Sequence, residues 1–102
     1  MSLEYFKKKV ERPIVSIHGS MAFTFIIQTD NTGIVNAYDS DLGVTIKSDY
    51  ELYYDEAQNL IIHLKDYNVK HGNWVGRGIS CNVIFLVDNL KKFESAYDLV
   101  GE

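Results

Sequence analysis

Residues 79–88, ISCNVIFLVD, decide the expected fold because they carry the clearest strand pattern in the chain. Every second residue from 79 to 87 is apolar, and toward the end the residues between them become apolar as well. Side chains of a strand point alternately to its two faces, so this pattern predicts a β-strand. Because both faces end apolar, we expect the strand to lie centrally in a sheet and to be covered on both sides.

A C-terminal helix is expected directly after this strand. Asp88 or Asn89 can cap its first turn. Four apolar residues then recur with helical spacing and form one stripe, namely Leu90, Phe93, Tyr97 and Val100. An apolar stripe on a helix with charged residues outside it predicts that the helix packs on the sheet.

The rest of the chain predicts one further helix and a series of short strands. Leu3, Phe6 and Val10 share a helical face, and Pro13 ends that helix. Segments with a period of two follow, separated by polar turns, at residues 14–28, 34–38, 42–47, 51–54 and 59–66. Connections this short favour antiparallel pairing, because a parallel crossover needs about a dozen residues. The expected fold is therefore α+β, with a mostly antiparallel sheet of about six strands, arranged as a meander or roll, an N-terminal helix and a C-terminal helix packed on the sheet.

The 102 residues are expected to form a single domain, residues 1–102, since two cores would leave neither half enough buried surface. The fractions of hydrophobic (46%) and charged (24%) residues are typical of globular proteins and argue against disorder. No fixed-period repeat or linker divides the chain. Residues 1–3 and 101–102 resemble ends that an expression vector supplies, and we expect no function there.

Charge is distributed unevenly along the chain. Ten Lys and Arg against 14 Asp and Glu give a formal net charge of −4, which disfavours direct binding to a nucleic-acid backbone. Residues 30–64 hold seven acids against Lys47 alone, a net charge of −6. We expect the later part of this segment to form an acidic, Tyr-rich edge that contacts a protein partner or a second copy of the chain. Its predicted binding residues are Tyr50, Glu51, Tyr53, Asp55 and Glu56.

Residues 71–78, HGNWVGRG, are the most irregular stretch and are expected to form a loop. His71, Trp74 and Arg77 supply a titratable ring, an aromatic face and a planar cation. Such residue types are favoured at binding sites, so these three join the predicted binding residues. If this loop and the acidic, Tyr-rich edge share one face, they form one composite site.

Three functions are compatible with these signals. The first is a small non-enzymatic binding or regulatory domain that acts through protein contacts, with self-association through an edge strand or aromatic surface as one form. The second is a ligand-binding or enzymatic roll whose pocket is lined by His63, His71, Tyr67 and Trp74. The third is an acidic mimic of nucleic acid, which requires carboxylates in a row along one face.

No motif predicts a cofactor, a metal or a catalytic residue. The sequence Asp39-Ser40-Asp41 begins like a calcium loop but lacks the further ligands. His18, His63 and His71 are too widely separated to predict a zinc site. Cys81 falls in the predicted central strand, where a thiol behaves as a small buried hydrophobic group. The sequence therefore favours a non-enzymatic protein.

The expected location is the cytoplasm. The single cysteine cannot form an internal disulfide, which fits a reducing compartment. The N-terminus lacks the apolar core of a secretory signal, and no apolar run approaches the roughly 18 residues of a spanning helix. We therefore expect no association with membranes.

Overall fold

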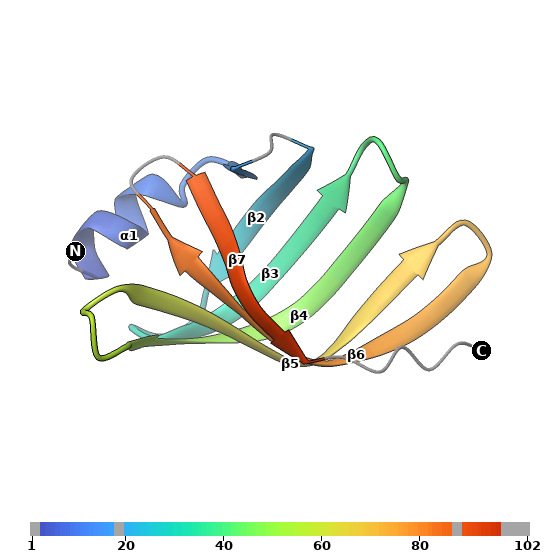
Figure 1. Ribbon diagram of the computed structural model, residues 1–102. Coiled ribbons are helices and arrows are strands. Elements are labelled where there is room, and N and C mark those ends of the chain that lie inside the picture. Colours follow the sequence, from blue (N-terminus) through green and yellow to red (C-terminus); the bar gives the residue numbers. More distant parts are fainter. Residues whose placement is uncertain (1–2, 18–19, 87–88, 97–102) are drawn as a thin grey trace.

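The computed structural model describes residues 3–17, 20–86 and 89–96, which form a closed β-barrel with a short helix at one end (Figure 1). In chain order the elements are α1 (Leu3–Lys9), β1 (Ile14–Ser16), β2 (Met21–Ile27), β3 (Thr32–Asp39), β4 (Val44–Tyr54), β5 (Leu60–His71), β6 (Trp74–Phe85) and β7 (Asn89–Ala96). Consecutive strands pair antiparallel, and β7 pairs in parallel with β1 to close the barrel.

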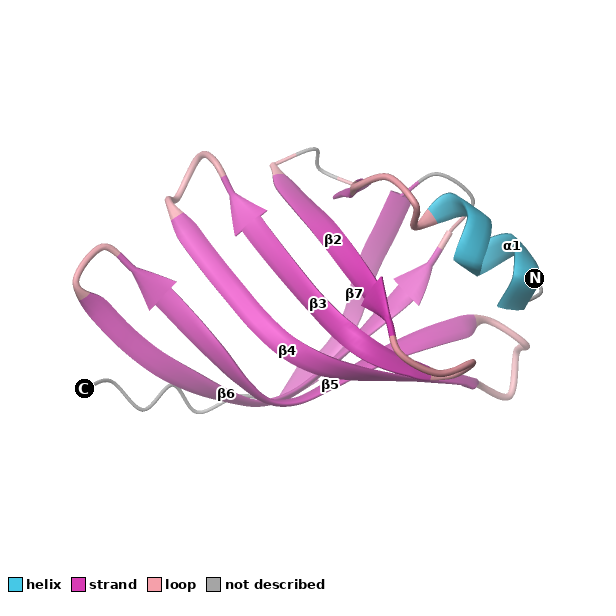
Figure 2. Ribbon diagram, turned by 180° about the vertical axis from the view of Figure 1, so that it is seen from behind, coloured by secondary structure: helices cyan, strands magenta, loops and turns pink. Residues whose placement is uncertain are grey.

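The predicted α+β fold is wrong, and its largest error is the C-terminal helix. Residues 89–96 form β7, which pairs with β6 on one side and β1 on the other (Figure 2). Leu90 is buried and Lys91 is exposed, as the alternation of a strand requires. Backbone pairing on both edges outweighs the weak helical preference of the segment. Tyr97 and Val100, the rest of the predicted stripe, lie outside the described residues.

The consecutive antiparallel order of a meander is present, but the expected sheet of about six strands is instead a closed barrel. Within the described residues there are seven strands, and the first pairs with the last, which closes the sheet into a barrel. Closure removes the two free edges that an open sheet would leave. The antiparallel pairing expected from the short connections is present at every hairpin, and the parallel pair joins strands from opposite ends of the chain.

The predicted N-terminal helix is present as α1, and it closes one end of the barrel. Phe6 is 1% exposed. Its ring lies edge-on to Phe25, Tyr50 and Phe85, with centroid distances of 5.5, 6.3 and 5.1 Å. A helix of seven residues is too short to be stable alone, so this packing holds it in place. No helix in the described ranges is long and apolar enough to cross a membrane.

An exposed ion pair also ties α1 to the turn between β2 and β3. The Lys7 Nζ donates a hydrogen bond of 2.6 Å to Oδ1 of Asp30. This bond raises the pKa of the Lys7 amine and lowers the pKa of the Asp30 carboxyl group. Since both groups are exposed, the ion pair contributes little free energy of folding, and its main effect is to hold α1 beside the β2–β3 turn.

β5 bends near its middle at a β-bulge. Lys65 and Asp66 are consecutive and both exposed, and Asp66 has a positive φ of 52°. The pairing of β5 with β4 shifts at this point. As a result, the inward-facing positions change from Leu64 to Tyr67, and the strand turns more sharply, as bulges cause. The β5–β6 turn lies at the end of the molecule opposite α1 (Figure 1).

The predicted loop at residues 71–78 is mostly strand. β5 continues to His71 and β6 begins at Trp74, with Gly72 at a positive φ of 61° in the turn. A Cβ atom at Gly78 would lie 2.0 Å from Cζ of Tyr67, because the ring of Tyr67 lies directly on the backbone of β6. The ring of Trp74 covers Gly76 in the same way. These glycines therefore make room for aromatic rings on the inner side of the sheet.

Candidate functional site

The interior of the barrel is filled at the α1 end and in the middle, but not at the opposite end. In the middle, around Val35, Ile62 and Val83, the packing leaves no room for a water molecule. At the end opposite α1 a cavity of about 230 Å³ remains, which we call the mouth cavity. All seven strands contribute to its lining. Its wall is mostly apolar and includes Met21, Phe23, Ile46, Tyr67, Cys81 and Leu90.

The size of the mouth cavity sets the size of what it can hold. An apolar cavity of about 150 Å³ is enough to hold benzene. At about 230 Å³, the mouth cavity has space for a six-membered ring with a short substituent. It lies below the roughly 300 Å³ at which pockets for drug-sized ligands begin.

Three polar residues stand at the rim of the mouth cavity, Ser16, Ser20 and Asp39. Asp39 ends β3 and is 7% exposed. Its Oδ1 accepts hydrogen bonds from the backbone N–H groups of Asp41 (2.9 Å) and Leu42 (3.1 Å). The Oγ of Ser16 accepts a bond of 3.4 Å from the backbone N–H of Met21. Asp39 thus shapes the β3–β4 turn while it borders the cavity.

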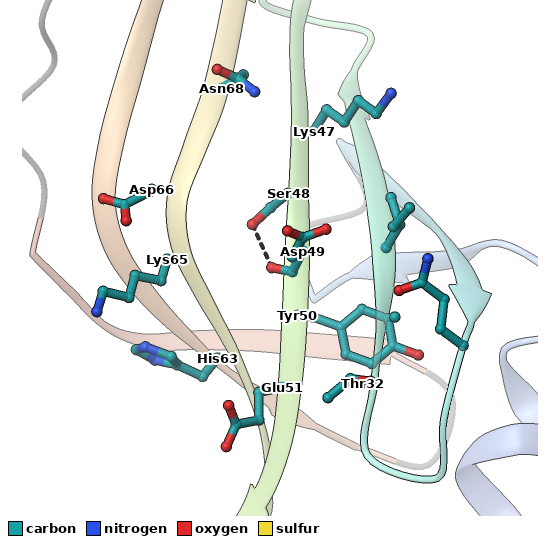
Figure 3. Close-up of a pocket in the computed structure, with 13 residues that line it drawn as sticks. Thr32, Lys47, Ser48, Asp49, Tyr50, Glu51, His63, Lys65, Asp66 and Asn68 are labelled. Carbon is teal, nitrogen blue, oxygen red and sulfur yellow. Dashed lines mark hydrogen bonds between the residues drawn. The ribbon is translucent and has the colours of Figure 1, made fainter.

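A second depression, the outer groove, lies on the outside of β3, β4 and β5 and has a volume of about 730 Å³ (Figure 3). Figure 3 shows Thr32 and Tyr50 on one side of β4 and the β5 side chains on the other. Its charged lining residues are Lys47, Asp49, Glu51, Lys65 and Asp66. No two of these form an ion pair within the described part of the chain. The groove is a surface of mixed charge.

The His63 side chain in the outer groove is held by contacts with two neighbouring strands. Its Nδ1 lies 2.6 Å from Oδ1 of Asn82 on β6. Because an amide oxygen only accepts, Nδ1 is the donor, and the Nε2 of the neutral ring is left as an acceptor. The ring also meets Tyr53 edge-on at 6.5 Å. The arrangement fixes the orientation of the ring on the outer face.

The predicted acidic, Tyr-rich edge is only partly an edge. Tyr50 faces the barrel interior and is 3% exposed, and this burial raises the pKa of its hydroxyl group. Glu51 and Tyr53 lie on the outer face of β4, and Asp55 and Glu56 lie in the β4–β5 turn. Four of the five predicted residues are therefore on the surface of one hairpin.

Asp55 also has a structural role in that hairpin. The backbone N–H of Asn59 donates to Oδ1 of Asp55 at 2.9 Å, and the Asn59 side chain donates to Oδ2 at 3.2 Å. The bond from the Asn59 backbone lowers the pKa of Asp55. A carboxylate that caps a turn in this way stabilises the hairpin whether or not a partner binds.

The predicted composite site does not form. The acidic hairpin and residues 71–78 stand at opposite ends of β5, and only the former lies near α1 (Figure 1). His71 ends β5 and is exposed, Trp74 packs half-buried against the core, and Arg77 is exposed on the outer face of β6. These three residues therefore do not join the acidic hairpin on one face.

The four residues proposed to line a pocket are also separated. Tyr67 lines the mouth cavity, whereas His63 lines the outer groove. His71 and Trp74 pair across the end of the β5–β6 hairpin and line neither. The structure thus contains a pocket inside the barrel, but only Tyr67 of the predicted set belongs to it.

The acids of residues 30–64 do not form one row. Asp39 borders the barrel interior, Asp41 lies in the β3–β4 turn, and Glu56 lies in a turn at the other end of the molecule. A mimic of nucleic acid needs carboxylates spaced along one face. This arrangement lends that hypothesis no support.

The chain was compared with protein-family models, curated proteins and solved structures, and none of these gave a match.

Of the residues that line the mouth cavity, Asp39 is the one that its position in the sequence could have indicated. Val35, Ala37 and Asp39 alternate on one face of β3, so Asp39 continues an inward-facing apolar row. An acid at the end of such a row lies where the barrel interior opens. Met21, Ile46 and the other wall residues could not be distinguished from ordinary core residues by sequence.

Proposed function

We propose that this barrel binds a compact, mostly apolar small molecule in the mouth cavity. The observation that carries the proposal is the cavity itself: one end of the barrel is filled by Phe6, while the other keeps about 230 Å³ lined by residues of every strand, most of them apolar. Ligands bind preferentially in the mouths of β-barrels, where the walls are preformed. The cytoplasm is the proposed location, since the single cysteine of the chain cannot form an internal disulfide, which fits a reducing compartment.

The two methionines of the chain provide a direct test. Met21 lines the mouth cavity, and Met1 is the other methionine of the sequence. In protein labelled with ¹³C at the methionine methyl groups, we expect benzyl alcohol to shift the Met21 signal in a saturable way and to leave the Met1 signal in place. Absence of a saturable Met21 shift at millimolar ligand would refute the proposal.

A pair of variants on β6 separates binding inside the barrel from binding outside it. Cys81→Leu places a larger side chain in the mouth cavity, and we expect it to abolish the Met21 shift. Ile79→Leu changes a residue that is 51% exposed on the same strand and is the matched control. If both variants bind benzyl alcohol like the unmodified protein, the ligand does not occupy the mouth cavity.

A second candidate function is self-association through the acidic, Tyr-rich edge. The observation that favours it is the exposure of Tyr53 and Tyr54, each 41% exposed at the end of β4 beside Asp55 and Glu56. Exposed tyrosines are enriched where proteins meet. Sedimentation velocity at rising concentration tests this. We expect a dimer that Tyr54→Lys dissociates and that Tyr38→Lys, at a tyrosine 53% exposed on β3, leaves intact; a monomer at all concentrations contradicts it.

A further inference from the structure

We infer that the ligand of the mouth cavity carries a protonated amine, which the carboxylate of Asp39 recognises. This inference rests on the proposed function and adds the chemical class of the ligand. Its basis is the position of one charged side chain at the rim of a mostly apolar cavity.

Asp39 belongs to the inner face of β3. It follows Val35 and Ala37 in the alternation of that strand, and all three are at most 7% exposed. In the pairing of β3 with its neighbours, Asp39 lies opposite Met21 of β2 and Val44 of β4. Its carboxylate therefore stands where the barrel interior opens, and it lines the mouth cavity together with Met21.

The hydrogen bonds of Asp39 leave part of the carboxylate available. An ionised carboxylate has two oxygens with about four lone-pair sites. Two of these are used by the backbone N–H groups of Asp41 and Leu42, and both bonds go to Oδ1. Oδ2 accepts no hydrogen bond from the described residues. It is thus the atom that a ligand can reach.

No protein cation compensates the charge of Asp39. In the described parts of the chain, the ion pairs involve Lys7 at the other end of the barrel. The Oδ2 of Asp39 is not sealed from water, since no buried side-chain oxygen of the described residues lacks a hydrogen-bond partner. A charged donor makes a stronger hydrogen bond to a carboxylate than a neutral donor does. A ligand ammonium group that enters with an apolar body would supply the missing positive charge.

The remaining polar groups of the rim favour a cation over an anion. Ser16 and Ser20 present neutral hydroxyl groups, and among the described residues no Lys, Arg or His lines the mouth cavity. Of the described rim residues Asp39 is the charged one, and its like charge repels a carboxylate or phosphate ligand. The expected order of affinity is amine, then neutral ligand, then acid.

Three probes of similar size test this order, namely benzylamine, benzyl alcohol and benzoate. Each is titrated into the protein labelled at its methionine methyl groups, with Met21 as the reporter and Met1 as the internal control. We expect benzylamine to bind about tenfold more tightly than benzyl alcohol, as one hydrogen bond to a charged group provides. Benzoate is expected to bind more weakly than the alcohol.

Two variants in the β3–β4 turn assign the preference to one residue. Asp39→Asn removes the charge but keeps an Oδ1 that can accept the two turn hydrogen bonds, so it preserves the fold. We expect it to equalise the affinities for benzylamine and benzyl alcohol. Asp41→Asn removes the same charge from an exposed residue of the same turn and should keep the tenfold preference.

The outcomes separate the two proposals. If benzyl alcohol binds at Met21 as tightly as benzylamine, the amine inference fails while the proposed function stands. Retention of the amine preference in Asp39→Asn also overturns the inference. If none of the three probes shifts Met21, the mouth cavity is not a ligand site and both proposals fail. Should Asp39→Asn not fold, the order of the three affinities in the unmodified protein still decides.

Discussion

The contact of Tyr67 with the backbone at Gly78 provides the most direct test of how the open end of the barrel is built. We consider the substitution Gly78→Ala. At an ordinary strand position, alanine in place of glycine stabilises a protein by roughly 0.4–1 kcal/mol, because the unfolded chain then has less conformational entropy to lose on folding. Here the added Cβ would lie 2.0, 2.2 and 2.5 Å from Cζ, Cε2 and Oη of Tyr67. The ring would have to move.

The distance that the Tyr67 ring has to move determines the expected change in the free energy of unfolding. Ordinary contacts of a Cβ atom begin near 3.4 Å, so the Tyr67 ring has to shift by about 1.4 Å. Tyr67 is 5% exposed, and forcing extra volume into a packed interior costs roughly 1–3 kcal/mol. Subtracting the gain from the unfolded state leaves a net destabilisation of about 1.3 kcal/mol at the centre of both ranges. The ring moves toward the mouth cavity that it lines, so ligand binding should weaken as well.

A double-mutant cycle with Tyr67→Ala isolates this contact. Without the ring, Gly78→Ala should stabilise the protein by about 0.7 kcal/mol, so the coupling energy is about 2 kcal/mol and the effect changes sign. Urea unfolding followed by circular dichroism measures each variant, and the single substitution should lower the midpoint by about 0.6 M. Trp74 and Gly76 form an equivalent pair, with 2.2 Å between the added Cβ and Cη2, for a second cycle. A stabilising Gly78→Ala in the unmodified background would refute the reasoning.

Three further predictions concern the closed end and the turns. Phe6→Ala should lower the free energy of unfolding in urea by about 3–5 kcal/mol, because the ring is fully buried among aromatic neighbours. The control Lys8→Ala, on the exposed face of the same helix, should change that free energy by less than about 0.5 kcal/mol. Hydrogen bonds lower the pKa of Asp55 in the folded protein, so the stability that its carboxylate contributes is complete above pH 3.8 and is lost as the pH falls through the lowered pKa. Asp55→Asn should therefore flatten the acid side of a plot of unfolding free energy against pH. An unchanged acid side would contradict this. Burial raises the pKa of Tyr50 above 10.0, so stability should fall as the pH rises past 10; absorbance titration should show one late tyrosine that is missing in Tyr50→Phe.

Much of the strand content was predictable because alternation is a local property. The predicted strands at 34–38, 51–54, 59–66 and 79–87 all fall within or largely within observed strands. The hairpin around residues 55–59 was likewise marked by its polar turn. These features depend on neighbours in the chain, which the sequence displays directly.

Barrel closure was not predictable, because it depends on contacts between the two ends of the chain. β7 pairs with β1, from Val15 opposite Asn89 to Ser16 opposite Leu90. Nothing in either short segment marks this parallel pairing, and the apolar residues of 89–96 recur with helical spacing, which favours a helix over a strand. Tertiary pairing decided between the two, which is the usual limit of reasoning from local propensity.

The candidate site was missed for a related reason. Its wall is built from single residues of all seven strands, so no segment of the sequence contains more than a small part of it. His71 and Arg77 were predicted as binding residues because their side-chain types are favoured at binding sites. A cavity of core-type residues has no such mark, and only the inward register of Asp39 could have indicated it.

The bulge in β5 determines the chemistry of the mouth cavity. Leu60, Ile62 and Leu64 face inward, and an unbroken alternation would next bring Asp66 inside. A second carboxylate would then face the interior near Asp39, and the two like charges would repel each other. The extra residue instead turns Asp66 outward and brings Tyr67 inward, where its ring settles against Gly78. The bulge therefore keeps Asp66 out of the mouth cavity and places Tyr67 in its wall, while β6 changes face in step, with Gly78 and Cys81 both buried.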